Sequence, residues 1–171
     1  DYGGALYNQN IYDGASINFM NCSFYNNQAS QEGGAIFYNS KLNGQNDGTI
    51  TNCIFWNNPA PIGNSIFTPE STNIQISHTL LEEASCITNA NCGNGMLYAI
   101  DPLFTDPANG DLSIQECSHA ADTGTNTGAP SDDIDGNFRP VNATGIVSAL
   151  TDMGAYEYQS SFPIVSDNCQ A

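Results

Sequence analysis

Positive charge is almost absent from this sequence. Of the 171 residues only Lys41 and Arg139 are basic, against 18 acidic residues, so the formal net charge is −16. Because nucleic acids are bound through clustered Lys and Arg, this composition excludes nucleic-acid binding, and it argues equally against attraction to an anionic membrane. Charged residues of both signs make up only 12% of the chain, about half the usual share, and Asn, Gly, Ser and Thr take their place.

The sequence also lacks a signal peptide, an apolar run of membrane-spanning length and any C-x-x-C pair. Membrane insertion is therefore not predicted for this segment, and its six cysteines do not suggest a zinc or thioredoxin-like motif. An even number of cysteines together with little lysine favours an oxidising, extracellular setting.

Two motifs recur at a spacing of about thirty residues. GGALY at 3–7 returns as GGAIF at 33–37, and NCSFYNN at 21–27 returns as NCIFWNN at 52–58. The segments are short, rich in Gly and Asn and without a 3.6-residue period, which excludes helix and indicates brief strands bounded by turns. Fainter third copies at 63–67 and 77–81 place His78 opposite the two motif cysteines.

Two short strand segments per repeat describe one coil of a solenoid, whose apolar side is buried only when coils stack. We therefore predict an all-β fold, a right-handed parallel β-helix closed by an irregular C-terminal cap. A propeller or sandwich fits paired motifs at this period less well. The paired Gly33 and Gly34 permit a sharp turn. Because the chain opens within a repeat, we expect further coils of the same chain N-terminal to Asp1.

Stacking at about 4.8 Å brings equivalent side chains of neighbouring coils together. Aromatic rings would stack inside the coil, and aligned amides would hydrogen-bond from coil to coil. Two stacked thiols would either remain free, as small apolar groups, or form a bridge. The three pairs are Phe24 with Phe55, Asn27 with Asn58 and Cys22 with Cys53.

The repeats and the second half of the chain resemble known surface proteins. GGAI at 33–36, with Phe-x-x-Asn at 24–27 and 55–58, resembles the repeats of polymorphic outer-membrane proteins, which are β-helical adhesins. Four later motifs resemble the closing segment of choice-of-anchor Q surface proteins: DPLFTDPANGDL at 101–112, CSHAADTG at 117–124, DIDGNFRP at 133–140 and DMGAYEY at 152–158. The resemblance implies a secreted bacterial protein attached to the cell surface, and no particular ligand or reaction.

We predict three parts along the chain. Residues 1–80 form regular coils, residues 81–158 the last coils, a loop over about 81–100 and the C-terminal cap, and residues 159–171 a linker or tail. The cap would cover the unpaired strand edges that a terminal coil exposes.

One loop is a candidate cation site. Asp133, Asp135 and Asn137 partly match an oxygen-rich Ca²⁺ loop, although the distal Glu of an EF-hand is missing. A structural turn is the favoured alternative. No cofactor is predicted apart from this candidate Ca²⁺.

The cap also offers a candidate buried ion pair. Arg139 is predicted to be partly buried and to pair with Asp152, Glu157 or Asp133, because Arg forms bidentate bonds that fix loops.

Two disulfides are predicted outside the coils. Cys86 and Cys92 lie close together in a loop, and Cys117 with Cys169 would tie the tail to the cap.

No catalytic residue is predicted, because His78 and His119 lack the partners that a catalytic or zinc site needs. We predict a non-catalytic extracellular protein that acts in adhesion or binds a polysaccharide or cell-surface glycan. The alternative is a polysaccharide lyase or glycoside hydrolase whose active site lies in coils before Asp1. Six aromatic residues are candidates for a sugar-stacking face, although those that alternate inward would simply belong to the core: Tyr7, Tyr12, Tyr25, Phe37, Tyr38 and Trp56.

Overall fold

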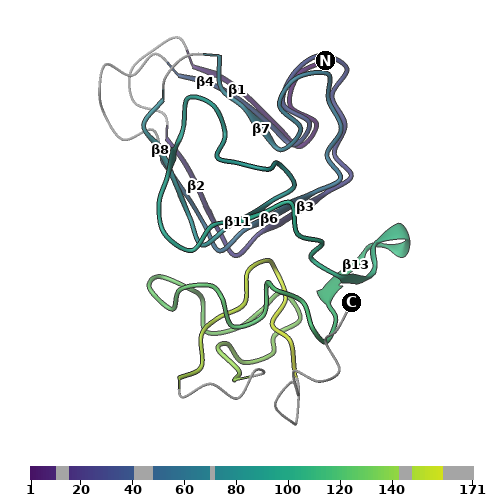
Figure 1. The fold of residues 1–171 in the computed structure, drawn as a ribbon, viewed down its shortest axis with the longest axis vertical. Coiled ribbons are helices and arrows are strands. Elements are labelled where there is room, and N and C mark those ends of the chain that lie inside the picture. Colours follow the sequence, from purple (N-terminus) through teal and green to yellow (C-terminus); the bar gives the residue numbers. More distant parts are fainter. Residues whose placement is uncertain (11–15, 41–47, 70–71, 143–147, 160–171) are drawn as a thin grey trace.

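A computed structural model describes residues 1–10, 16–40, 48–69, 72–142 and 148–159. Three parallel sheets are stacked from successive coils, and in Figure 1 their strands superimpose along three sides. The first sheet holds β1 (Leu6–Asn10), β4 (Ile36–Ser40) and β7 (Ile66–Phe67). The second holds β2 (Ile17–Met20), β5 (Gly48–Thr51), β8 (Ile74–Ser77) and β10 (Asn91–Cys92). The third holds β3 (Ser23–Tyr25), β6 (Ile54–Trp56), β9 (Leu80–Leu81) and β11 (Leu97–Tyr98).

The predicted parallel β-helix is confirmed, with three strands in each full coil instead of two. Every pairing within the three sheets is parallel, and the register joins Leu6 to Ile36 and then to Ile66. The GGA motif leads directly into the strands of the first sheet and the NC motif contains those of the third, whereas the strands of the second sheet lie outside both motifs.

The paired glycines precede each strand of the first sheet because a side chain has no room there. Gly33 has φ of 69°, and a Cβ atom on it would lie 2.3 Å from the carbonyl oxygen of Ile36. A Cβ atom on Gly34 would lie 1.9 Å from the carbonyl oxygen of Asn58. The Gly-Gly pair therefore permits a close approach of neighbouring turns.

A single left-handed residue in each coil turns the chain from the second sheet into the third. Asn21, Asn52 and His78 have φ of 50°, 53° and 44°, and Asn tolerates this region better than most residues. The register joins Thr51 to Ser77, so His78 corresponds to Asn52. The sequence alignment that set His78 against Cys53 was wrong by one residue, because it rested on a faint copy in a shortened coil.

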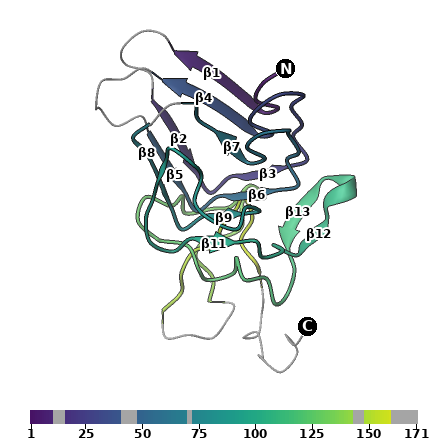
Figure 2. The ribbon, with the colours of Figure 1, turned by 45° about the horizontal axis from the view of Figure 1, so that its top comes forward.

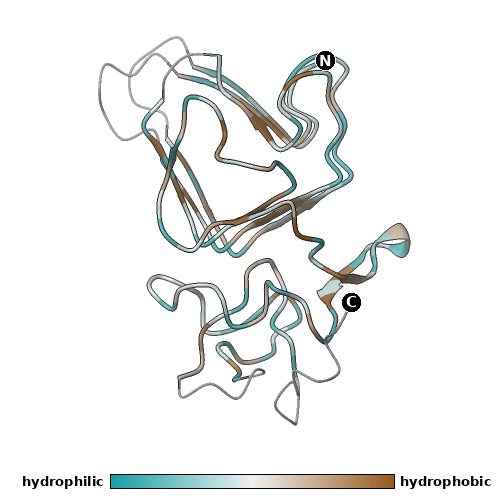
Figure 3. Ribbon diagram, in the orientation of Figure 1, coloured by the Kyte–Doolittle hydropathy of each residue, from teal (hydrophilic) through white to brown (hydrophobic). Residues whose placement is uncertain are grey.

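The interior of the coils is apolar and stacked in register. The Phe24 and Phe55 rings lie 4.4 Å apart at an interplanar angle of 4°, a contact that contributes about 0.5–1.5 kcal/mol beyond burial. The Asn27 amide donates to Asn58 Oδ1 at 2.9 Å, and the Asn58 amide donates to the Phe24 carbonyl at 3.0 Å. Figure 3 shows apolar residues concentrated on the strands and polar residues on the turns between them.

A shortened last coil closes the C-terminal end of the solenoid. After β9 the chain crosses the end of the core, where Ile87 is buried, and the backbone of Asn89 accepts hydrogen bonds from Thr72. β10 and β11 then extend the second and third sheets. The stacking therefore reaches Tyr98, and the prediction that residues 81–100 form a loop was wrong for these two strands.

Residues 99–142 and 148–159, called here the lateral layer, pack beside the coils. They include β12 (Phe104–Asp106), the 3₁₀ turn η1 (Pro107–Asn109) and β13 (Asp111–Ile114). Figures 1 and 2 both show the hairpin of β12 and β13 beside the third sheet. The predicted C-terminal cap is thus irregular in structure, but it covers the side of the solenoid and not its end.

Alternation along the third sheet explains this position. In β6 the Phe55 side chain points into the coil, whereas Ile54 points outward and is fully buried by the lateral layer. Ile54 belongs to a second hydrophobic core, between the third sheet and the lateral layer, which also includes Leu80, Phe104 and Met153. The outer face of the third sheet is therefore apolar at Ile54 and Leu80 because another layer covers it.

Candidate functional site

A groove lies where the lateral layer leaves the third sheet uncovered. Its floor is a row of three side chains from successive coils: Tyr25, Trp56 and Glu82. The register pairs Tyr25 with Trp56, and Glu82 directly follows Leu81, the residue paired with Phe55, so it lies next to Trp56. Together with residues of the lateral layer, this row encloses a cavity of about 320 Å³. We call it the aromatic groove; it is lined by Tyr25, Trp56, Asn57, Glu82, Asp101, Leu103, Phe104, Pro107 and Gln115.

Hydrogen bonds and a ring contact hold the lining of the aromatic groove in place. Tyr25 packs edge to face against Phe104, with ring centroids 5.8 Å apart. The Asn57 backbone N–H donates to Glu82 Oε2 at 2.8 Å. The Leu103 backbone N–H donates to Asp101 Oδ1, also at 2.8 Å. The groove therefore combines two half-buried aromatic side chains with two positioned carboxylates.

Such a lining suits a small polar ligand with one apolar face. Binding sites for small molecules pair aromatic walls with a few placed polar groups, and they have volumes of roughly 300–1,000 Å³. The aromatic groove lies at the lower end of this range. Its aromatic side chains offer apolar surface to such a ligand, while the carboxylates can accept hydrogen bonds from ligand donors.

Of the six aromatic residues singled out in the sequence, the structure brings two together in the groove, Tyr25 and Trp56. Tyr38 is fully buried in the core, and Tyr7 lies on the outer face of the first sheet, stacked on Phe37 at 5.1 Å. Tyr12 lies outside the described residues.

Sequence reasoning missed Glu82, Asp101 and Phe104. The outward position of Glu82 follows from the register of the third coil, which is shorter than the others, and Asp101 and Phe104 reach the groove only because the lateral layer folds sideways. The alternation that turns Trp56 outward was the one signal in the sequence that pointed to this face.

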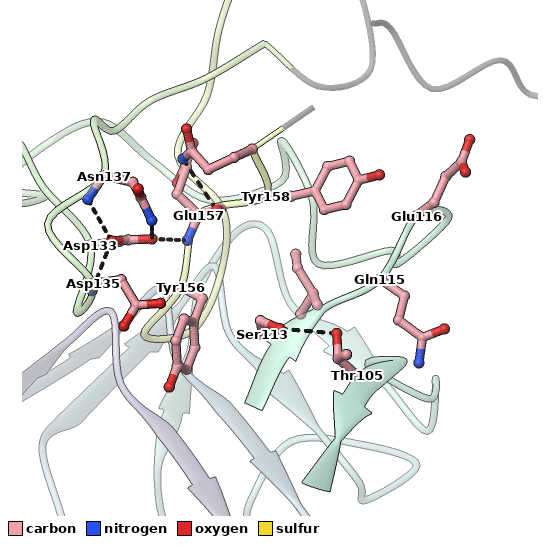
Figure 4. Close-up of a pocket in the computed structure, with 12 residues that line it drawn as sticks. Thr105, Ser113, Gln115, Glu116, Asp133, Asp135, Asn137, Tyr156, Glu157 and Tyr158 are labelled. Atoms are coloured by element: carbon pink, nitrogen blue, oxygen red, sulfur yellow. Dashed lines mark hydrogen bonds between the residues drawn. The ribbon is translucent and has the colours of Figure 1, made fainter. Parts of the chain in front are cut away.

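The candidate Ca²⁺ residues form a hydrogen-bonded turn (Figure 4). Asp133 Oδ1 accepts the backbone N–H groups of Asp135 and Asn137, both at 2.9 Å, and Oδ2 accepts the Glu157 backbone N–H at 3.0 Å and the Asn137 amide at 3.2 Å. Burial would raise the pKa of Asp133, but these donors outweigh it and the pKa lies below its usual value. Among the described residues, no group of three or more His, Cys, Asp and Glu is arranged to hold a metal ion. The structural turn and the Ca²⁺ site both stay predictions, and these hydrogen bonds favour the structural turn.

Arg139 lies buried in the lateral layer beside Glu157. Its Nε is 3.1 Å from Glu157 Oε2, and its Nη2 donates to the carbonyl of Gly154 at 3.3 Å. The Nε–H has no well-aligned acceptor, so the contact with Glu157 is an ion pair and not a directed hydrogen bond. Glu157 also accepts the backbone N–H groups of Val141 at 2.7 Å and Asp152 at 3.0 Å.

Asp152 is the second carboxyl of this cluster. Burial, followed by the nearby charge of Glu157, raises the pKa of Asp152 to about 8. Its two oxygens accept the backbone N–H groups of Asp122 at 2.7 Å and Tyr158 at 2.6 Å. Burial also raises the pKa of Glu157, against the opposing effects of its hydrogen bonds and of Arg139. The cluster joins distant parts of the lateral layer, and its burial favours a structural role.

The left-handed Asn residues of the coils also hold the lateral layer. The Asn21 amide donates to the carbonyl of Asp152 at 2.9 Å. Asn52 exchanges two hydrogen bonds of 2.8 Å with the backbone of Thr125. The same residues that turn the coil therefore position the layer that forms one wall of the aromatic groove.

The cysteines take two different states in the described residues. Cys86 and Cys92 form a disulfide, whereas Cys22 and Cys53 are free thiols of neighbouring coils. A hydrogen bond from Cys53 lowers the pKa of Cys22 to about 7, and burial raises the pKa of Cys53. The predicted Cys117–Cys169 bridge involves Cys169, which lies outside the described residues.

One comparison with known proteins gives a match, and it lies in the repeat. The family model of the Chlamydia polymorphic membrane protein repeat matches residues 21–39, which span β3 and most of β4. No match was found among curated proteins or among solved structures. In the part of the chain that the structure describes, no helix is long and apolar enough to cross a membrane. The chain thus carries a repeat of the Chlamydia polymorphic membrane protein type, set in the stacked parallel sheets of a β-helix.

Proposed function

We propose that this chain belongs to a non-catalytic cell-surface protein that binds glycans in the aromatic groove. The observation that carries the proposal is the row of Tyr25, Trp56 and Glu82 on one outer face, with Asp101 opposite in the same cavity. The match to a polymorphic membrane protein repeat supports a surface location and an adhesive role.

The groove has the chemistry that sugars require. The C–H faces of a pyranose ring pack against aromatic side chains, and ring hydroxyls donate to carboxylates. Glu82 and Asp101 are each held by a backbone N–H at 2.8 Å, so these acceptors are positioned before a ligand arrives. A pre-organised site loses less entropy on binding.

The distribution of carboxyl groups supports binding over catalysis. A general acid needs a carboxyl whose pKa is raised by its surroundings and which reaches the ligand. Of the carboxyls that the structure describes, the two whose pKa values are raised, Asp152 and Glu157, do not line the aromatic groove. The groove carboxylates are therefore assigned to ligand recognition.

The single tryptophan makes the proposal testable by fluorescence. Trp56 is the chain's one Trp residue, so a sugar stacked on it changes the emission of the protein directly. Titration with a panel of oligosaccharides should give a saturable change for at least one member. By calorimetry, Trp56→Leu should weaken that binding by about two- to tenfold, since an aromatic contact contributes about 0.5–1.5 kcal/mol.

Phe138→Ala is the matched control, because Phe138 is 80% exposed and lies outside the groove lining. It should bind like the unaltered protein. Absence of a saturable change with every glycan, or equal affinity of Trp56→Leu, would overturn the proposal.

A further inference from the structure

The charge of the aromatic groove limits the class of ligand that the groove can bind. Its lining contains two carboxylates, Glu82 and Asp101, and no Lys, Arg or His. Arg139, the one arginine of the chain, is buried in the lateral layer and paired with Glu157. No cationic side chain of the described residues therefore neutralises the groove from within.

The aromatic side chains, like the carboxylates, favour a positively charged ligand. The face of an indole or phenol ring attracts a cation placed over it, and Trp56 lies in the row between Tyr25 and Glu82. A carboxylate next to an aromatic face thus offers one cation two attractive contacts. The formal net charge of −16 adds long-range attraction for cations and repels anionic sugars such as uronates.

We infer that the aromatic groove selects an amino sugar with a free, protonated amine. This inference rests on the proposed function and specifies its ligand class. The sugar ring packs on Tyr25 and Trp56, while the ammonium group lies over the Trp56 ring and contacts Glu82 or Asp101. N-acetylation removes the positive charge and with it both of these contacts.

The test compares two trisaccharides with the same ring skeleton, a glucosamine trimer and its fully N-acetylated form, at a mildly acidic pH that keeps the amines protonated. Trp56 fluorescence and calorimetry report binding to the intact chain. We expect the glucosamine trimer to bind at least about fivefold more tightly, and its affinity to fall as the NaCl concentration rises, because exposed ion pairs are screened.

Glu82→Gln is the decisive variant. Gln keeps an oxygen that can accept the Asn57 N–H, and it removes the charge, so the preference for the glucosamine trimer should fall roughly two- to fivefold. Glu32→Gln removes one charge from a residue that forms β-bridges with Tyr2 and Ile62 outside the groove lining, and it should leave the preference unchanged. Melting curves of both variants confirm that they are folded.

The outcomes separate the inference from the proposed function. If the acetylated trimer binds as tightly as the glucosamine trimer, the inference is overturned and glycan binding survives. If Glu32→Gln and Glu82→Gln weaken binding equally, the attraction is to net charge alone, which also overturns the inference. If no glycan changes the fluorescence, both are overturned.

Discussion

Raising the pH through neutrality should remove a stabilising contribution that comes from the buried carboxyl of Asp152. The pKa of Asp152 is raised to about 8 by burial and by Glu157, whereas an unfolded Asp has a pKa of about 3.9. The folded state therefore holds this proton more tightly than the unfolded state. The stabilisation is complete below about pH 4 and is lost as the pH rises through about 8.

The size of the effect follows from the pKa difference. Between about pH 6 and pH 9 the contribution of Asp152 to the free energy of unfolding should fall by on the order of 3 kcal/mol, since each pKa unit is worth about 1.4 kcal/mol. For a chain of this length, 1 kcal/mol shifts the melting temperature by about 2–4 °C. The part of the change in melting temperature that comes from Asp152 is therefore a fall on the order of 6–12 °C.

Asp152→Asn isolates the contribution of this carboxyl and its coupling to Glu157, because the titration of groups that do not interact with Asp152 cancels when the two proteins are compared at the same pH. Asn cannot ionise, but its amide nitrogen leaves the backbone N–H of Asp122 or Tyr158 without an acceptor, at a cost of about 1–3 kcal/mol. The variant should therefore be less stable near pH 6 and about equal near pH 9. Melting curves from circular dichroism check this, and two parallel profiles across this range would refute the reasoning.

Three further predictions concern the lateral layer and the last coil. Arg139→Ala should cost about 3–5 kcal/mol in chemical denaturation, because Glu157 would remain buried without its cation; a change within the range of a surface pair, about 0–1 kcal/mol, would contradict this. Ca²⁺ should leave the melting temperature unchanged, since both oxygens of Asp133 already accept N–H groups; a rise of several degrees that Asp133→Asn abolishes would instead establish a metal site. Replacing Cys86 and Cys92 by Ser should lower the free energy of unfolding by about 2–4 kcal/mol; equal melting temperatures of the variant and the unaltered protein would contradict this.

The coil architecture could be predicted from the sequence because stacking repeats its signals. Gly33 and Gly34 mark a turn that excludes a Cβ atom, and Phe24 with Phe55 mark an inward pair one coil apart. Each signal appears twice at a fixed spacing, so the register of the first two coils follows directly. The third coil is shorter and its copies are faint, and the alignment there slipped by one residue at His78.

The lateral layer could not be placed from the sequence. Its motifs are local, whereas its position depends on contacts between residues more than seventy positions apart, such as Asn52 with Thr125. Ile54 was the informative residue, because an apolar side chain on the outer face of a coil requires a covering layer. The aromatic groove depends on that placement, so only its floor, Tyr25 and Trp56, was within reach of sequence reasoning.

The central claim, that the aromatic groove is the ligand site, is tested most directly by a crystal structure of the protein with the oligosaccharide that binds it best. We predict a sugar ring packed on Trp56, with Tyr25, Glu82 and Asp101 among its contacts. An ordered sugar bound elsewhere, for example in the cavity beside Tyr156, with an empty aromatic groove, would contradict the account.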